Sequence, residues 1–591
     1  MSCGVRESER LPLTAGENQT SSAKKRSSQR CLNWHPSYTV LAATFLERVA
    51  FVSLLAVFTE YHEFIAGGNP TTSKVLLLLC TKVSYVGAVF SGLLADTVLG
   101  HYRVLLISIL MQFAGSLLVL AAIIHNTMQS AREEVNVVQD SLFDRLVTPG
   151  LVLFGLGVAG AGGTEVPLGV SQHSLLGEAE QKAKAFFPRY YFLIGAGVVI
   201  GAGIGIVTAQ GAAYQIYGHV LPSVFYFFSF LVLALSRGVR TEKPSRAHPL
   251  SDVWRVAKEA MKVIWRRPAS RGGGGRRSMA ASSSVAPYTG RVYWKNSKGS
   301  LADWVRYAEE SHGGSIQYNT VARVHNFLSA VAVLAAMVIV GVTINQNLAV
   351  FISQGNRMTV PRMSASLYVP ASAVALFDTL GVLLGIPLVT YVIYPCWRSF
   401  SGGTPPSHLQ RITVGILIAM LGTVAATILE VERRKEGRWN STVIEDPDNP
   451  NRTLTISSVS IFWQIPQYTL CGLSEVFVLL SGMEFAYSRS PTGMKGISIG
   501  FGYAFLGLSA AGSVVLLWIM QQRFESLTYL DDAQGEVHLY FIVLGGILAV
   551  GLAVFQAVAM HFKTAPIYGL ETMSQSHPAT YSTSTAMHSS V

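Results

Sequence analysis

The chain has 591 residues, of which 50% are hydrophobic and 13% are charged, and its formal net charge is +11. A soluble protein of this size would carry about 25% charged residues, so the composition excludes an ordinary soluble fold. Several apolar runs exceed the roughly 20 residues that a helix needs to cross a bilayer, and they do not alternate as barrel strands do. The sequence therefore predicts an all-α, polytopic membrane protein.

The apolar runs fall into two sets on either side of a polar stretch, and by length we expect about twelve spans. The predicted spans are 38–60, 73–96, 101–125, 147–171, 187–209, 214–236, 326–352, 367–393, 409–430, 459–486, 497–519 and 539–561. We interpret this order as a tail (1–37), a six-helix bundle (38–236), a linker (237–325), a second six-helix bundle (326–561) and a tail (562–591). The Gly/Ser/Arg-rich linker is expected to be mostly disordered, with short surface helices at its flanks, 251–267 and 300–310.

Basic side chains gather in the N-terminal tail and in the linker, for example at Lys24 and Arg266. Positive charge near span ends stays in the cytosol, so the linker and both termini are predicted to be cytosolic. The loop 431–458 then faces the lumen or the exterior, and it contains glycosylation sequons at Asn440 and Asn451. Topology thus accounts for the basic excess, which indicates the lipid bilayer and not a nucleic acid as partner.

The segment from Gly92 to Arg103, GLLADTVLGHYR, lies where the second span meets the third. Gly92 and Gly100 permit a tight turn and a close approach of helices. Asp96 can cap a helix or pair with a cation, and so hold a gate closed. This spacing resembles the loop signature of the major facilitator superfamily, although an ordinary polar turn is the alternative.

Three glycines of the fifth span, Gly197, Gly201 and Gly205, are four residues apart. No strand or soluble helix flanks them, which argues against a nucleotide-binding loop. Small residues at this spacing let two membrane helices approach closely, so we expect a packing stripe.

Ionisable residues interrupt apolar runs in both halves, where each costs about 2.5–3.5 kcal/mol at a helix centre. Glu47 and Arg48 are adjacent and point about 100° apart, so we expect each to meet another partner or a water-filled cavity. The other intramembrane charges are Lys82, Glu165, Asp378 and Glu475. Charges from both halves are typical of a substrate and ion pathway, with structural ion pairs as the alternative.

The chain resembles the proton-coupled oligopeptide transporters, and within them the peptide–histidine branch of animals. The resemblance is carried by Glu47-Arg48, Gly92–Gly100, AFFPRYY at 185–191, PASAVALFDTLGVLLGIPL at 370–388 and, most closely, residues 457–491. It implies a twelve-helix major facilitator fold, a transporter and not an enzyme, a small-molecule substrate, and no cofactor beyond the proton as coupling ion.

The resemblance also implies roles for single residues. Glu47 and Arg48 match the core of the family's first-helix motif E-x-x-E-R-F-x-Y-Y, which is concerned with proton coupling. Glu475 matches the tenth-helix acid that meets a peptide's amino terminus, and Tyr85 matches a cavity tyrosine.

Three further residues are assigned less directly. Gln346 lies where relatives have a polar residue in the seventh helix, and Trp463 lies in the best-matching segment, so both are placed at the substrate site. Asp378 is expected to support a gate in the second half.

The N-terminal half departs from the family pattern. The first motif glutamate is Thr44, and the fourth-helix lysine is Glu165, which reverses the charge. Lys82 lies three residues before Tyr85 and so shares its helix face. We hypothesise that Lys82 supplies the missing cation, paired with Glu165 or Glu47; the alternative is that it reaches toward lipid headgroups.

These patterns favour a proton-coupled symporter of histidine or of di- and tripeptides that works by alternating access. Two other functions stay open: a transport-deficient membrane scaffold with a cytosolic adaptor, and a carrier with altered coupling or substrate. The segment Glu7–Leu13 is similar to acidic-plus-leucine sorting signals, so an endolysosomal membrane is expected, with the plasma membrane as the alternative.

Overall fold

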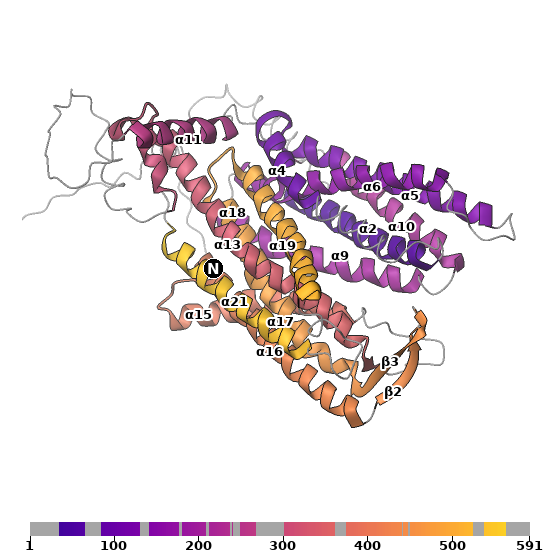
Figure 1. The fold of residues 1–591 in the computed structure, drawn as a ribbon. Coiled ribbons are helices and arrows are strands. Elements are labelled where there is room, and N and C mark those ends of the chain that lie inside the picture. Colours follow the sequence, from indigo (N-terminus) through magenta and orange to yellow (C-terminus); the bar gives the residue numbers. More distant parts are fainter. Residues whose placement is uncertain are drawn as a thin grey trace, which may run out of the picture.

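The computed structural model describes residues 35–64, 84–130, 141–175, 180–208, 212–236, 239, 249–266, 301–360, 374–439, 441–446, 449–523 and 537–562. These residues form two helical bundles (Figure 1). Eleven of the described helical stretches are long and apolar enough to cross a membrane, and Ser84–Leu99 is a shorter apolar stretch. The first part of the predicted span 73–96 lies outside the described residues. The chain is thus an all-α membrane protein, as the sequence predicts.

The first bundle is built from α2 (Pro36–Phe64), α4 (Ser84–Leu94), η2 (Ala95–Leu99), α5 (His101–Ser130), α6 (Ser141–Gly162), α7 (Glu165–Leu175), α8 (Glu180–Lys184), α9 (Phe186–Thr208) and α10 (Ala212–Ala234). The second is built from α13 (Tyr318–Gly355), β1 (Met358–Thr359), α14 (Leu376–Leu388), η6 (Val389–Ile393), α15 (Tyr394–Phe400), α16 (His408–Trp439), β2 (Ser441–Asp446), β3 (Asn449–Ser460), η7 (Ile461–Gln464), α17 (Ile465–Glu475), η8 (Val476–Leu480), α18 (Ser481–Arg489), α19 (Lys495–Arg523) and α21 (Val537–Met560).

The fourth predicted span, 147–171, is two helices and not one. α6 ends at Gly162 and α7 begins at Glu165, with a turn at Gly163 and Thr164 between them. A Cβ atom at Gly163 would lie 2.6 Å from the Ala88 carbonyl oxygen of α4. The missing side chain thus lets α4 approach the break, and the break places Glu165 in the first turn of α7.

Both flanks of the linker are helical, as the sequence predicts. α11 (Pro249–Arg266) is followed, after residues outside the described part, by the 3₁₀ helices η3 (Asp303–Ala308) and η4 (Glu310–His312). The apolar stripe Val256, Ala260 and Val263 of α11 is buried, and Val256 and Ala260 pack with Val305 in one cluster. This packing extends α13 back to Tyr318, so the second bundle begins before the predicted residue 326.

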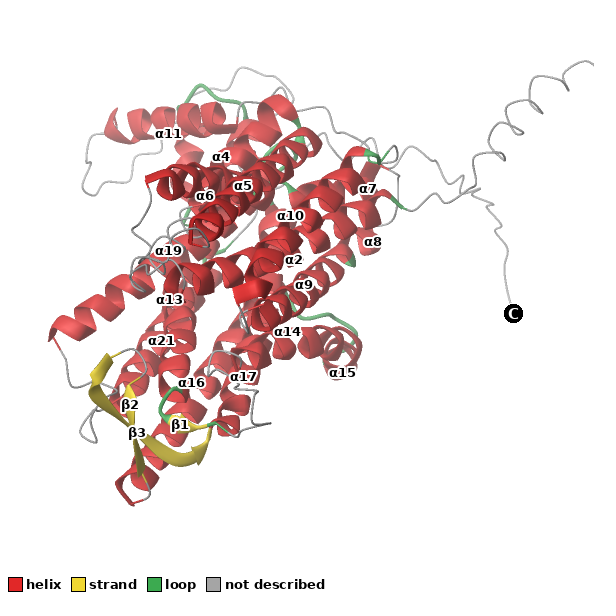
Figure 2. Cartoon of the chain, turned by 90° about the vertical axis from the view of Figure 1, so that its right-hand side faces the viewer, coloured by secondary structure: helices red, strands yellow, loops and turns green. Residues whose placement is uncertain are grey.

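The predicted loop 431–458 is also structured. α16 continues to Trp439, and β2 and β3 form an antiparallel hairpin in which Ser441 faces Ser457. β1 adds to β3 as a parallel strand. Figures 1 and 2 show this sheet at the opposite end of the molecule from α11. We call these the hairpin end and the linker end.

The glycines of α9 pack against α2. A Cβ atom at Gly201 would lie 2.8 Å from the Val49 carbonyl oxygen, and one at Gly205 would lie 2.5 Å from the Ala56 Cβ. A Cβ atom at Gly197 would lie 3.1 Å from the Arg48 Cβ. The predicted packing stripe is confirmed, and it brings α9 against the turn of α2 that contains Glu47 and Arg48.

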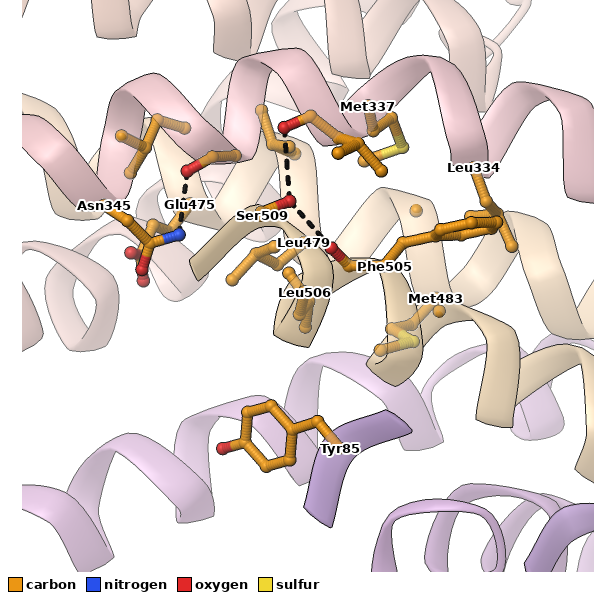
Figure 3. A pocket seen from close by; sticks show the side chains of 16 residues that line it. Tyr85, Leu334, Met337, Asn345, Glu475, Leu479, Met483, Phe505, Leu506 and Ser509 are labelled. Atoms are coloured by element: carbon orange, nitrogen blue, oxygen red, sulfur yellow. Dashed lines mark hydrogen bonds between the residues drawn. The ribbon is translucent and has the colours of Figure 1, made fainter. Parts of the chain in front are cut away.

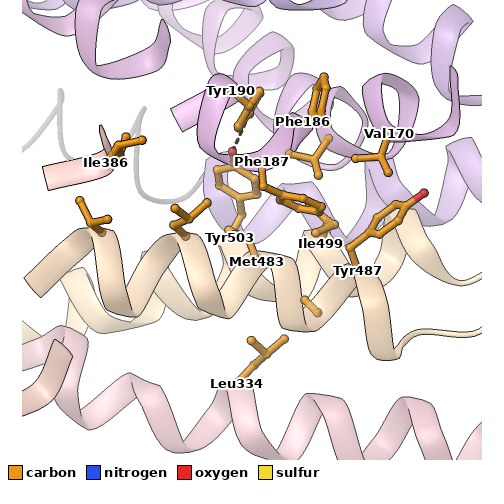
Figure 4. Close-up of a cluster of buried hydrophobic side chains, with 14 of the residues drawn as sticks. Val170, Phe186, Phe187, Tyr190, Leu334, Ile386, Met483, Tyr487, Ile499 and Tyr503 are labelled. Carbon is orange, nitrogen blue, oxygen red and sulfur yellow. Dashed lines mark hydrogen bonds between the residues drawn. The ribbon is translucent and has the colours of Figure 1, made fainter. Parts of the chain in front are cut away.

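The two bundles meet along α4 and α19 and along α9 and α14. Gly92 and Ala88 of α4 lie against Gly496 and Gly500 of α19. One cluster of buried side chains contains Val170, Phe187 and Tyr190 from the first bundle together with Tyr487 and Ile499 from the second (Figure 4). Residues 496–500 open α19 and follow α18, so this contact closes the linker end.

Asp96 ties the bundles together at this contact. Its carboxylate accepts hydrogen bonds from the backbone N–H groups of Gly496, at 3.1 Å, and Ile497, at 2.9 Å, in the first turn of α19. His101 Nε2 lies 3.2 Å from Asp96 Oδ1, whereas Arg103 is exposed. Gly100 has a φ of 79°, which favours glycine at the turn into α5. Asp96 therefore caps a helix of the other bundle, and His101 is the adjacent basic group.

Replacing Gly201 by alanine is expected to destabilise the protein, because the new methyl group meets the α2 backbone. Overpacking of this kind costs about 1–3 kcal/mol, so the melting temperature in detergent should fall by several degrees. Gly203→Ala is the matched control, since nothing lies within 4 Å of a Cβ atom there. Equal melting temperatures for the two variants would contradict the packing role of Gly201.

Replacing Asp96 by alanine is expected to release the linker end, because the first turn of α19 loses its cap, which is worth about 0.5–2 kcal/mol. Spin labels at the exposed positions Arg103 and Arg489 would report the distance between the bundles by pulsed electron resonance, after replacement of the native cysteines. We expect a new population at longer distance. Glu432→Ala, which removes an exposed acid, is the control. A distance distribution of Asp96→Ala identical to that of the parent protein would contradict the role of Asp96 in holding the bundles together.

Candidate functional site

Glu47 and Arg48 lie in the middle of α2, and they do contact each other. Arg48 Nη2 is 3.6 Å from Glu47 Oε2, and the guanidinium lies 5.0 Å from the centre of the Phe51 ring. The two side chains are close but do not satisfy each other, which agrees with the expectation that each meets a further partner; Glu165 is a second electrostatic neighbour of Arg48. The contact is not a hydrogen bond, and neither Glu47 Oε2 nor Arg48 Nε has a hydrogen-bond partner among the described residues.

Glu165 joins this charged turn from α7. Its side chain is 1% exposed, and Glu47 and Arg48 are its electrostatic neighbours. Tyr190 of α9 donates a hydrogen bond of 2.7 Å to Glu165 Oε2. The structure therefore brings together three charges that the sequence predicts to converge. Lys82, the fourth, lies outside the described residues, so its pairing stays a hypothesis.

A cavity of about 240 Å³ is lined by α13, α17, η8, α18 and α19 of the second bundle and by one residue of the first (Figure 3). Tyr85 of α4 faces it from the first bundle, and its other polar lining residues, Asn345, Glu475 and Ser509, come from the second. Met337, Phe505 and Leu506 are among the apolar residues of its wall. We call it the central cavity; it combines one acid, neutral hydrogen-bonding groups and apolar surface.

A second cavity of about 160 Å³ lies where α9 meets α14. Tyr191, Asp378, Thr379 and Glu475 supply its polar groups, and the rest of its lining is apolar or glycine. Glu475 lines both cavities, so the second, which we call the side cavity, adjoins the central one. Asp378 Oδ1 is buried without a hydrogen-bond partner among the described residues.

Two predicted substrate residues lie elsewhere. Gln346 is 2% exposed and lines neither cavity, while its neighbour Asn345 lines the central one. Adjacent helical residues point about 100° apart, so an error of one position moves a side chain out of the cavity. Trp463 is 67% exposed in η7 and lines neither cavity. Neither residue lines the two cavities, and their role in substrate binding stays a prediction.

Three tyrosines were missed as site residues. Tyr190 and Tyr191 belong to the AFFPRYY segment, which the sequence did single out, but Tyr503 of α19 carried no motif. Its hydroxyl lies 3.2 Å from that of Tyr190, and its ring lies 5.6 Å from the ring of Tyr85. Only the meeting of α4, α9 and α19 reveals it.

The glycosylation sites and a metal site can be addressed only in part. Asn440 lies outside the described residues, and Asn451 lies in the backbone of β3. Within the described ranges, no three His, Cys, Asp or Glu side chains are grouped to hold a metal ion.

Comparison with known proteins also indicates a membrane transporter. Residues 102–530 match the model of the POT family. Solute carrier family 15 member 3 of Rattus norvegicus is 24% identical over 94% of this chain and 96% of its own length. Protein NRT1/PTR family 8.1 of Arabidopsis thaliana is 22% identical over 90% of this chain and 94% of its own.

Solved structures share the fold. An auto-inhibited POT family peptide transporter superposes with a TM-score of 0.61 and 18% identity, covering 90% of this chain and 98% of its own. The POT family transporter PepTSo gives a TM-score of 0.59 with 18% identity over 90% and 99% of the two chains. The chain belongs to the POT family of transporters.

Proposed function

We propose that this protein is a proton-coupled symporter of di- and tripeptides, and of histidine, that works by alternating access. The observation that carries the proposal is the position of Glu475 in the central cavity, which both bundles line, with the Glu47, Arg48 and Glu165 cluster in the first bundle. Intramembrane charges around a site at the interface of two repeats are typical of substrate and ion pathways.

Glu475 is proposed to bind the amino group that peptides and histidine share. A carboxylate facing an ammonium group forms a charge-assisted hydrogen bond, which is the stronger kind. Asn345 and Ser509 line the same cavity and offer neutral hydrogen-bonding groups, while the apolar wall accepts varied side chains.

The three-charge cluster is proposed as the proton site. Two carboxylates share one guanidinium, so the described cluster carries one excess negative charge when both acids are ionised. Uptake of one proton neutralises this excess in a medium where unpaired charge is costly. Lys82, if it joins Glu165 as hypothesised, would hold the ionised form in place until a proton releases the pair.

The departures from the family pattern favour two alternatives. Thr44, where the motif has an acid, is 2% exposed and its hydroxyl has no partner among the described residues. Loss of that acid would suit a carrier with altered coupling, or a transport-deficient scaffold for a cytosolic adaptor. We favour the symporter because Glu165 restores a carboxylate beside Glu47 and Arg48.

The proposed place of work is an endolysosomal membrane with both termini in the cytosol. An acidic lumen would supply the proton gradient that such a symporter needs. In that orientation the linker end is cytosolic, and the hairpin end, with its two sequons, is lumenal.

Purified protein in liposomes is expected to accumulate labelled alanyl-alanine when a pH gradient is imposed, and to stop when a protonophore is added. Labelled histidine is tested in parallel. Glu475→Gln should lower peptide uptake by about tenfold or more, because a hydrogen bond to a charged group contributes about 1.5–3 kcal/mol. Glu432→Gln, at an exposed acid, is the control.

The same assay separates the alternatives. Uptake without dependence on the gradient would indicate altered coupling. No uptake of either substrate by the parent protein would favour the scaffold.

The side cavity is expected to favour peptides with a cationic side chain. Its two carboxylates, Asp378 and Glu475, line it with no Lys, Arg or His among the lining residues described. Asp378→Asn should therefore weaken competition by alanyl-lysine about tenfold relative to alanyl-alanine, since a charged hydrogen bond is lost. Thr379→Val is the matched control in the same cavity. Equal changes for the two peptides would exclude a charge-selective role.

A further inference from the structure

A chain of three side chains crosses from the first bundle to the second. Glu165 Oε2 accepts from the Tyr190 hydroxyl at 2.7 Å, and that hydroxyl lies 3.2 Å from the Tyr503 hydroxyl of α19. Figure 4 shows the contact between the two tyrosines. Glu165 and Tyr190 are each 1% exposed and Tyr503 is 9% exposed, so the described protein shields the chain from solvent.

The direction of this chain depends on the charge of Glu165. A phenol has one proton, and Tyr190 gives it to Glu165 Oε2. The bond between the tyrosines must then be donated by Tyr503. An ionised Glu165 thus aligns both hydroxyl groups toward the first bundle.

Protonation of Glu165 weakens or reverses this alignment. A proton on Oε2 makes that oxygen a donor, so Tyr190 must turn its own proton toward Tyr503. A proton on Oε1, which has no hydrogen-bond partner among the described residues, leaves Oε2 a neutral and weaker acceptor. In both cases the hydrogen bond between Tyr190 and Tyr503, which joins the bundles, changes in direction or in strength.

The groups around Glu165 make it responsive to a proton. Glu47 of α2 repels its charge and Arg48 of α2 attracts it, while Tyr190 of α9 is its hydrogen-bond donor. Tyr85 of α4 contacts Tyr503 and lines the central cavity. The chain therefore begins at the charged cluster and ends beside the cavity.

Tyr503 connects the change in its hydrogen bond with Tyr190 to the central cavity. It lies on α19, whose first turn is held by Asp96 through Gly496 and Ile497. On the same helix, Gly502, Phe505, Leu506 and Ser509 line the central cavity. α19 is thus hydrogen-bonded to the first bundle through its first turn and through Tyr503, and the second of these contacts depends on the proton of Glu165.

We propose that Tyr503 is a positioning residue that links protonation of Glu165 to α19. Protonation changes the hydrogen bond that Tyr190 makes with Tyr503, and this change couples proton binding to opening of the cavity. The proposal rests on the proposed function. It adds a residue of the second bundle to the coupling machinery.

The test compares two assays on Tyr503→Phe, which removes only the hydroxyl. Uptake driven by a pH gradient requires the carrier to bind a proton on one side of the membrane and release it on the other. Exchange of labelled for unlabelled alanyl-alanine at equal pH requires no net proton movement. We expect gradient-driven uptake to fall about tenfold, because a buried hydrogen-bond chain is interrupted, while exchange stays within about twofold. The dependence of exchange on pH should also flatten.

Tyr540→Phe is the matched control, since its hydroxyl is buried without a hydrogen-bond partner among the described residues. Tyr190→Phe should behave as Tyr503→Phe does, and the double variant should be no worse than either, because the residues act in one chain. If Tyr503→Phe does not elute as a monodisperse protein, the two assays on Tyr190→Phe decide between the outcomes.

The outcomes are distinguishable. Full gradient-driven uptake by Tyr503→Phe, or an equal fall in both assays, would overturn the proposal while the symporter stands. No uptake and no exchange by the parent protein would overturn the proposed function itself, and this inference with it.

Discussion

The cost of placing ionised groups where water is scarce is the constraint on which this structure depends. In the first bundle the protein meets it by bringing three charged side chains together. Glu47 and Arg48 lie on one helix, Glu165 enters from the break between α6 and α7, and the Tyr190 hydroxyl donates a hydrogen bond to Glu165. The glycines at 163, 197 and 201 follow from the same need, because helices can enclose a small charged cluster only if they approach closely.

Much of the fold could be predicted because lipid imposes length and composition on each span. α9 and α10 lie within two residues of the predicted boundaries, as do α19 and α21 at their starts. The break before Glu165 could not be predicted, since Gly163 and Thr164 read as part of one apolar run. The extra turns of α13 and α16 also escaped, because they pack on protein outside the apolar run and so carry no hydropathy signal.

The candidate site was predicted in its charges and missed in its neutral groups. An acidic residue in an apolar helix stands out in the sequence, because an ionisable side chain in the bilayer is costly in free energy. Glu47, Glu165 and Glu475 were found in that way. Tyr503 and Asn345 are neutral, cost less to bury than a charge, and therefore do not stand out in the sequence. Gln346 shows the other limit, because helical phase decides which of two adjacent amides reaches a cavity, and phase is fixed by packing.

The polar network at the hairpin end has a mechanical meaning. Gln354 of α13 donates to Glu430 of α16 and accepts from Gln464 and Gln467 at the start of the tenth span, while β1 and β3 join the same elements. Arg433 also donates to both carboxylate oxygens of Glu430, through its Nε and Nη2 atoms. That end of the second bundle is cross-braced, whereas the π-helical turns η6 and η8 lie farther along toward the linker end. Such turns are local widenings of a helix, so in the alternating access proposed above the helices of the second bundle are expected to bend there and not at the cross-braced end.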